Sequence, residues 1–136
     1  MAEKNLNTLL SNIAPHLRSG NFVFCSISKD QLKSLTVIPL CLFHEEEGVS
    51  LIVEKSAADR ECLQYIGCWS LITCEVKSDL NAAGFLATIS KVLAEADIPL
   101  NAVSAYFHDH LFVPTEKAEQ AVDLLIQLSA SSRHRS

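Results

Sequence analysis

The residues in this sequence best suited to chemistry are two histidines that flank an aspartate, His108, Asp109 and His110. Two imidazoles with a carboxylate between them could bind zinc or share a proton. No second cysteine or histidine pair stands at ligand spacing, and the three residues lie between two strand-like segments. The pattern therefore favours a hairpin turn over an interface contact, a ligand contact or a metal site. An enzyme with His108 or His110 as its base is the least supported interpretation.

The sequence contains five cysteines, Cys25, Cys41, Cys62, Cys68 and Cys74. Because their number is odd and no export signal precedes them, reduced thiols in a cytoplasmic protein are expected. The last three are spaced by six residues, which does not match the paired CxxC motifs of zinc sites. Glycine-rich phosphate loops, GxSxG and HExxH motifs are also absent. We therefore expect no metal, no cofactor and no catalytic activity.

The composition is that of a folded chain with an acidic surface. The chain has 136 residues, of which 49% are hydrophobic and 20% charged, so it can bury a core. Eleven basic residues against sixteen acidic ones give a net charge of −5, which repels phosphate backbones. No apolar run approaches the roughly 20 residues that span a bilayer. Binding to nucleic acid or insertion into a membrane is therefore not expected.

Hydrophobic periodicity predicts a similar order of elements in the two halves. In the first half we expect a helix over residues 6–17 that kinks or ends near Pro15, strands at 22–27, 35–43 and 49–53, and a helix at 56–65. In the second half we expect a strand at 69–76, a helix capped by Ser78 and Asp79, a hairpin at 100–113 and a helix at 116–128.

Each half contains a hairpin followed by a helix, as in the βαββαβ ferredoxin-like motif. The second half lacks the sixth element of that motif, because only a polar tail follows its last helix. Residues 22–27 could supply the missing strand, or the strand at 69–76 could also serve the first half. Two interlocked units with a shared antiparallel sheet are therefore expected.

Several segments carry a resemblance to a known family. They are EVKSDL at 75–80, AGFLATI at 83–89, NAVSAY at 101–106 and LFVP at 111–114, with GNFVF at 20–24 and EGVSLI at 47–52 in the first half. The second half resembles an ACT domain, a small regulatory module, and the whole chain resembles bacterial stand-alone proteins of two tandem ACT domains. We expect an N-terminal ACT-like unit at 1–67, a C-terminal ACT domain at 68–130 and a flexible tail at 131–136.

The resemblance implies an α+β fold of ferredoxin-like units with antiparallel sheets and helices on one face. It also implies a small effector, often an amino acid, bound between units near the turn from the first strand to the first helix. In this sequence the matching residues are Ser78, Asp79, Leu80, Asn81, Ala83 and Gly84, with Asn101, Val103 and Ser104 on the adjacent strand. The resemblance implies no catalysis by a domain that stands alone.

The chemistry of these residues agrees with such a site. A helix start offers unpaired N–H groups to a carboxylate, and Asp79 can offset an ammonium group. Gly84 permits close approach, and Asn101 and Ser104 can supply directed hydrogen bonds. Simpler roles stay open: helix capping for Ser78 and Asp79, close packing for Gly84, and strand entry for Asn101.

The sequence thus predicts a cytoplasmic regulatory protein that binds a small effector, an amino acid, and lacks a catalytic domain of its own. It would act through ligand-dependent assembly, as a homodimer or higher oligomer, or through a partner protein. The alternative is a structural or interaction module that has lost its ligand site. Trp69, Tyr106 and Phe107 would then be its exposed anchors.

Overall fold

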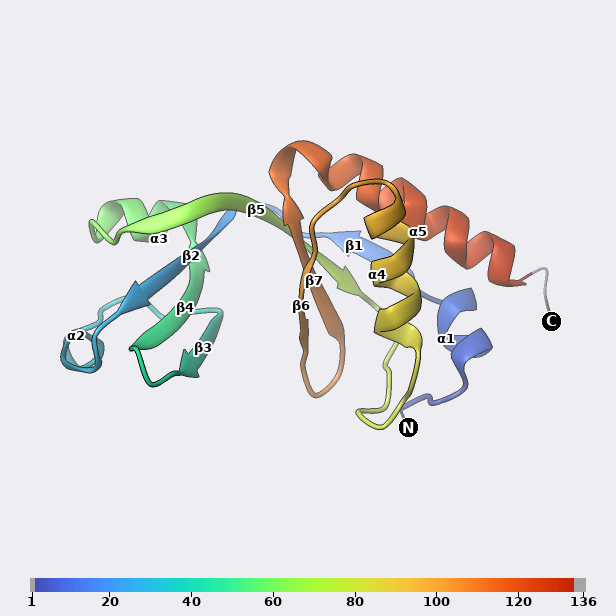
Figure 1. Ribbon diagram of the computed structural model, residues 1–136, viewed down its shortest axis with the longest axis horizontal. Helices are drawn as coiled ribbons and strands as arrows, with labels where there is room; N and C mark the ends of the chain where they lie inside the picture. Colours follow the sequence, from blue (N-terminus) through green and yellow to red (C-terminus); the bar gives the residue numbers. More distant parts are fainter. Residues whose placement is uncertain (1, 134–136) are drawn as a thin grey trace. The chain divides into compact units, whose positions relative to one another are not determined.

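The computed structural model describes residues 2–133 and divides into two compact units (Figure 1). Residues 19–69 form one of them, here called the central unit. Residues 2–18 and 70–133 form the other, here called the split unit, because the central unit lies between its two parts in the sequence. The N-terminal residues thus pack with the C-terminal half, an arrangement that a linear boundary at residue 67 does not describe.

The central unit is a complete βαββαβ motif. Its elements are β2 (Phe22–Ile27), α2 (Lys29–Lys33), β3 (Cys41–His44), β4 (Val49–Glu54), α3 (Lys55–Arg60) and the first half of β5 (Tyr65–Cys74). The strands lie in the order β3-β4-β2-β5, with antiparallel pairing. Alternate apolar residues of β2 and β4, such as Cys25 and its partner Leu51, face a core closed by Ala57 and Ala58 of α3.

The split unit has the same motif, but its sixth element, the fourth strand, comes from the beginning of the chain. Its elements are the second half of β5, α4 (Phe85–Glu95), β6 (Asn101–Ser104), β7 (Asp109–Pro114), the 3-10 turn η1 (Thr115–Lys117) and α5 (Ala118–Arg133), with α1 (Leu6–Ser11) and β1 (Pro15–Leu17). The strands lie in the order β1-β5-β7-β6. The expected α+β class and ferredoxin-like units are confirmed.

The strand β5 serves both units. Its residues Tyr65 and Ile66 pair with β2, and its residues 72–74 pair with β1. The expectation that a strand near 69–76 also completes the first half is therefore confirmed, with the strand beginning earlier, at Tyr65. The alternative source of the split unit's missing strand, residues 22–27, is wrong because β2 pairs with β4 and β5 in the central unit.

The missing strand is β1, where the periodicity predicts helix. The helix α1 ends at Ser11, and Ala14 adopts a positive φ of 45° that turns the chain. Pro15 has no N–H and cannot continue a helix, so the chain extends instead, and Pro15 pairs with Cys74. The apolar residues Leu9, Leu10 and Ile13 are nevertheless buried in the core of the split unit, as their spacing indicates.

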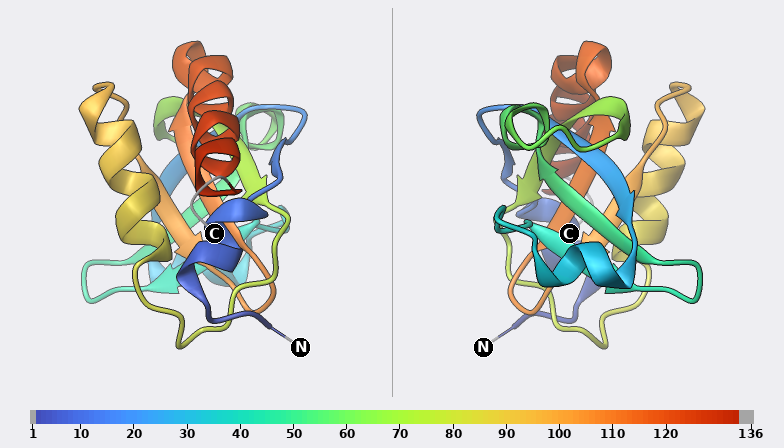
Figure 2. Two further views of the ribbon diagram at one scale, coloured as in Figure 1. Left: turned by 90° about the vertical axis from the view of Figure 1, so that its right-hand side faces the viewer. Right: turned by 90° about the vertical axis from the view of Figure 1, so that its left-hand side faces the viewer.

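The helix α5 continues beyond its expected end at residue 128. Residues 131–133 belong to it rather than to a tail, whereas residues 134–136 of the expected tail lie outside the described residues. The end of α5 lies beside α1 in the split unit (Figure 2). Ser129 Oγ and Arg133 Nη1 both donate to the carbonyl oxygen of Ser11, at 2.9 and 2.8 Å, which satisfies the end of α1.

Two further expectations in the first half are corrected, and one helix was not expected. The strand predicted at 35–43 is confined to Cys41–His44, and Pro39 lies outside it. The helix predicted at 56–65 ends at Arg60, because the chain must extend again to begin β5 at Tyr65. The polar stretch after β2 forms the helix α2, which a capping box between Ser28 and Gln31 stabilises.

Candidate functional site

A cavity of about 120 Å³ lies at the start of α4 in the split unit. Five of the expected site residues line it, Ser78, Asp79, Leu80, Gly84 and Ser104. The rest of the lining comes from Ala82, the first turn of α4 and Asp109. The other four expected residues are not part of the lining: Asn81 and Ala83 are exposed in the preceding loop, and Asn101 and Val103 lie on β6 opposite Phe112 and His110.

The loop before α4 is held by the N-terminal residues. The N–H of Glu3 donates to the carbonyl of Lys77 at 2.9 Å, and the N–H of Asp79 donates to the carbonyl of Glu3 at 2.8 Å. Leu6 lies against Gly84, where a Cβ atom would meet the Leu6 side chain at 3.3 Å. The beginning of the chain therefore positions one side of the cavity.

Asp109 is the buried charge of the site. Only 4% of its surface is exposed, and its two carboxylate oxygens accept hydrogen bonds from Ser78 Oγ and Ser104 Oγ, each at 2.6 Å. The strand register pairs Ser104 with Asp109, which brings the two side chains together. The turn expected at 108–110 instead spans 105–108, because Ala105 N–H donates to the His108 carbonyl and β7 already begins at Asp109.

The carboxylate of Asp109 has no cationic partner within residues 2–133, whose ion pairs all involve other residues. A buried carboxylate is costly to desolvate unless a cation or several donors compensate it. Two hydroxyl donors compensate it only partly, because a carboxylate can accept about four hydrogen bonds. The cavity beside Asp109 is therefore a place where an ammonium group would be stabilised.

The start of α4 offers a partial positive charge, and its N–H groups attract an anion. Gly84 is the N-cap residue, with a φ of +90°, and no side chain caps the helix. The N–H of Thr88 donates to the carbonyl of Gly84, so the N–H groups of Phe85, Leu86 and Ala87 precede the regular helical hydrogen bonds. All three residues line the cavity. Free N–H groups and the positive end of the helix dipole favour a carboxylate here.

The expected capping of this helix by Ser78 and Asp79 is wrong. The Ser78 hydroxyl donates to Asp109, and the Asp79 carboxylate accepts the N–H of Asn81 at 2.8 Å in a local turn. The helix begins only at Phe85, after a glycine that has no side chain to cap it. Asp109 was expected only in a turn; its position two residues before the apolar run Leu111–Val113 was the available signal of its burial.

The two histidines flank Asp109 without forming a metal centre. Their ring centroids lie 6.4 Å apart, and His110 Nδ1 is 3.0 Å from Thr73 Oγ1. Among residues 2–133, no group of three histidine, cysteine, aspartate or glutamate side chains is arranged to hold a metal ion. Burial lowers the pKa of His110, and the charges of His108 and Arg18 lower it further, against the opposing effect of Asp109 and Glu75.

Acidification is expected to weaken the folded state through His110. Its pKa in the folded protein lies below the ordinary value of 6.5, so the unfolded chain binds the proton more readily. The stabilisation is complete above pH 6.5 and declines as the pH falls below that value. Urea titrations between pH 7.5 and 5.5 should show a smaller decline for His110→Asn than for the wild type. The control is His44→Asn, which replaces an exposed histidine of the central unit. If the free energy of unfolding of His110→Asn declined with pH as steeply as that of the wild type, His110 would not be the group responsible.

The five cysteines are all free thiols. Burial raises the pKa of Cys74 to about 12, with smaller contributions from the charges of Asp109 and Glu75. Burial also raises the pKa of Cys25. Cys62 is exposed, while Cys41 and Cys68 are half-buried. The two buried thiols therefore remain protonated at neutral pH and are poor nucleophiles.

Comparisons with known proteins agree with the fold. Residues 1–70 match one family model described as "ACT domain", and residues 66–127 match a second model with the same description. Among curated proteins none matches this chain at a significant level.

No helix within residues 2–133 is long and apolar enough to cross a membrane.

Several solved structures have a similar fold. A Vibrio cholerae protein of unknown function, described as a possible transport protein, is 36% identical, with a TM-score of 0.83 over 93% of this chain and 97% of the other. An Agrobacterium tumefaciens protein is 17% identical, with a TM-score of 0.65 over 85% and 87% of the two chains. The regulatory subunit of aspartate kinase from Thermus flavus is 11% identical, with a TM-score of 0.61 over 84% and 95%.

Proposed function

The chain belongs to the ACT domain family, and from that premise we propose that it is a regulatory protein that binds a free α-amino acid at the start of α4. The observation that carries this proposal is one cavity lined by both an uncapped helix N-terminus and a buried aspartate that has no cationic partner within residues 2–133. The N–H groups of Phe85–Ala87 would bind the α-carboxylate of the ligand, and Asp109 would bind its α-ammonium group. A zwitterion satisfies both groups at once.

Ser78 and Ser104 position the carboxylate of Asp109 by donating to both of its oxygens. Their hydroxyl oxygens also retain acceptor capacity for a ligand N–H. Asp79 and Gly84 line the same cavity, so the proposal keeps these residues of the sequence-derived site. We assign no contact with the amino acid to the other four expected residues, Asn81, Ala83, Asn101 and Val103.

The size of the cavity bears on how regulation would work. About 120 Å³ is well below the ~300–1,000 Å³ of most small-molecule sites, so it fits the α-amino and α-carboxyl groups but not a large side chain. We propose that the side chain of the ligand projects from the cavity, where a second copy of the chain or a partner protein covers it. A ligand that binds one assembly state more tightly would shift the population toward that state.

A thermal-shift screen against the twenty common amino acids tests the proposal. A ligand at ten times its dissociation constant should add about 1.4 kcal/mol to the free energy of unfolding, which corresponds to a few degrees in Tm. Light scattering with and without the hit then measures assembly. The controls are two analogues of the hit, one without its carboxylate and one without its amino group, and each should lose most of the shift. Equal shifts with all three compounds, or a flat panel at millimolar ligand, would contradict an amino-acid site.

An interaction module is the second candidate function. The turn between β6 and β7 exposes Tyr106 and Phe107, with 75% and 58% of their surfaces accessible and their rings in an edge-to-face contact. Exposed aromatic side chains are enriched at protein interfaces. Trp69, the third expected anchor, is half-buried and packs on Phe24 at a ring distance of 5.5 Å, so it is not an exposed anchor.

A further inference from the structure

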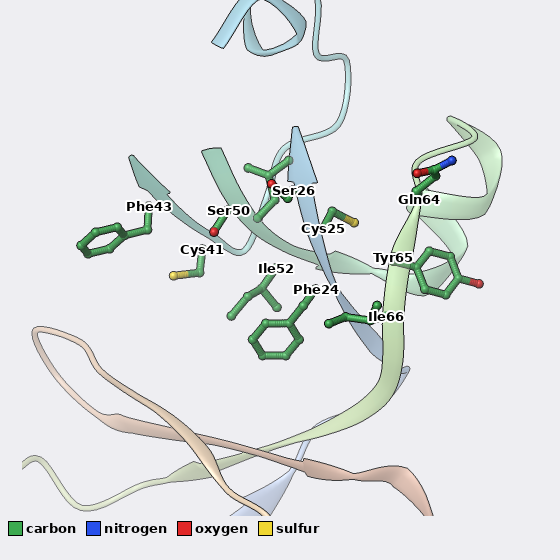
Figure 3. Close-up of a pocket in the computed structure, with 11 residues that line it drawn as sticks. Phe24, Cys25, Ser26, Cys41, Phe43, Ser50, Ile52, Gln64, Tyr65 and Ile66 are labelled. Atoms are coloured by element: carbon green, nitrogen blue, oxygen red, sulfur yellow. The ribbon is translucent and has the colours of Figure 1, made fainter. Parts of the chain in front are cut away.

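The open face of the central sheet carries a second cavity, built from other residues than the α4 site. Its volume is about 670 Å³, within the ~300–1,000 Å³ typical of small-molecule sites. The lining residues come from β2, β3, β4, the start of β5 and Gln64 just before it (Figure 3). No residue of this cavity belongs to the site proposed for the amino acid.

The strand register arranges this face in two rows. Cross-strand pairing aligns an apolar row, Ile66, Phe24, Ile52 and Cys41, beside a second row that contains Ser26, Ser50 and Phe43. Figure 3 shows Phe24, Ile52 and Ile66 on the same side of the sheet, with Tyr65 directed away from them. The first row forms an apolar floor, and the second row places two hydroxyl groups along one side of it.

The apolar residues of this cavity range from buried to well exposed. Ile52 is only 7% exposed, whereas Phe43 and Ile66 are 68% and 76% exposed. A molecule that covered these two side chains would remove apolar surface from water, which is favourable roughly in proportion to the area. The cavity therefore suits a ligand with an apolar body rather than a fully polar one.

The charge beside Ser50, which lines the cavity, is negative. None of the described residues that line the cavity is charged, but Ser50 Oγ, in the second row, donates to the carboxylate of Glu45. Glu45, Glu46 and Glu47 form the turn between β3 and β4 and are all exposed. This arrangement attracts a cation and repels a carboxylate, because no lysine, arginine or histidine among the described residues lines the cavity to balance an anion.

We propose that this cavity is a binding site for a small amphipathic amine that carries no carboxylate. Its apolar body lies over Phe24, Ile52 and Ile66, and its protonated amine faces Ser50 and Glu45. The class of ligand differs from the zwitterion of the first site, since the α4 site supplies donors for a carboxylate and this cavity supplies none with a positive charge. The chain would thus bind two chemically distinct small molecules, one in each unit.

Alkylation of Cys41 provides a direct test, because its thiol lines the cavity and Cys62 is an exposed internal control outside it. The purified full chain is treated with iodoacetamide at neutral pH, and each cysteine is followed by peptide mass spectrometry. With 2-phenylethylamine at nine times its dissociation constant, the rate at Cys41 should fall about tenfold while the rate at Cys62 stays constant. If Cys41 is unreactive from the start, amide shifts of Ser26, Ser50 and Ile52 in NMR titrations replace the rate as the readout.

Matched probes and variants test separately whether the cavity binds a ligand and whether that ligand must be a cation. The anion 3-phenylpropionate should give at least tenfold weaker protection than the amine, and the uncharged 2-phenylethanol should lie between them. Glu45→Gln should weaken binding of the amine without weakening that of the alcohol, whereas Glu47→Gln in the same turn is the control. No effect of the amine on Cys41 or on the amides overturns the site. Equal binding of amine and anion overturns the assigned charge of the ligand.

Discussion

Replacement of Leu9 by alanine is expected to lower the free energy of unfolding by about 2–5 kcal/mol, the usual cost of removing a buried leucine side chain. Leu9 is fully buried, and it packs in the core of the split unit together with residues of β5, α4 and α5. The loss should appear as a lower midpoint in urea or guanidinium titrations with an unchanged slope.

The matched control lies one turn earlier on the same helix. Leu6 is 37% exposed, so Leu6→Ala should cost distinctly less than Leu9→Ala. A chain that begins at residue 19 should fail to form the native split unit, because it lacks β1 and three core residues, Leu9, Leu10 and Ile13. Equal, small costs for both leucine variants would show that the N-terminal residues are not part of this core.

The N-terminal residues of the split unit show which parts of the fold could be predicted from the sequence. Apolar periodicity marked one face made of Leu6, Leu9, Leu10, Ile13 and Leu17, because that signal depends only on spacing. Three of these residues, Leu9, Leu10 and Ile13, are buried, whereas Leu6 and Leu17 are 37% and 39% exposed. Periodicity could not separate α1 from β1, because a three-residue strand carries too little pattern to be distinguished from the end of a helix. The decisive influence is long-range: Pro15–Leu17 extends because β5 offers an edge to pair with, far away in the sequence.

The candidate site was partly predictable for a similar reason. A turn rich in serine, aspartate and glycine before an apolar helix identifies the loop that contains Ser78, Asp79 and Gly84. The start of the helix was placed five or six residues too early, because Ser78 and Asp79 are favoured caps whereas the actual N-cap is Gly84, which caps without a side chain. Asp109 joins the site only through the register of β6 and β7, which local sequence does not determine.

Substitution of Asp109 by asparagine is expected to separate stability from ligand binding. The volume is conserved, and the charge of a carboxylate with 4% exposure is removed. The free energy of unfolding without ligand should stay within about 1 kcal/mol of the wild type, or rise, because replacing an incompletely compensated buried charge is often neutral or stabilising. Affinity for the amino acid identified by the thermal screen should fall by about 30-fold or more, since loss of one partner of a buried charge pair costs about 2–5 kcal/mol.

Chemical denaturation without ligand and calorimetry with it measure the two quantities separately. Asp123→Asn, an exposed aspartate on α5 of the same unit, should change neither. Asp109→Ala should instead lose stability, because the hydroxyls of Ser78 and Ser104 lose their acceptor. If Asp109→Asn lost stability and kept its affinity, Asp109 would be a structural residue of the β6–β7 hairpin, and the amino-acid site would be refuted.

The direction of these two changes follows from how the hydrogen bonds can be rearranged. An asparagine at position 109 keeps one oxygen that accepts a hydrogen bond, and its NH₂ group donates, so one serine hydroxyl can rotate and accept instead. Both serines therefore stay satisfied, and the fold has little reason to weaken. A ligand ammonium group cannot rearrange in this way, because it has only donors and would face the NH₂ group or a neutral oxygen. A residue retained for folding alone needs only to keep the two serine hydroxyls hydrogen-bonded, which asparagine can do, whereas one that binds a cation requires the charge. The two measurements on Asp109→Asn therefore distinguish these roles.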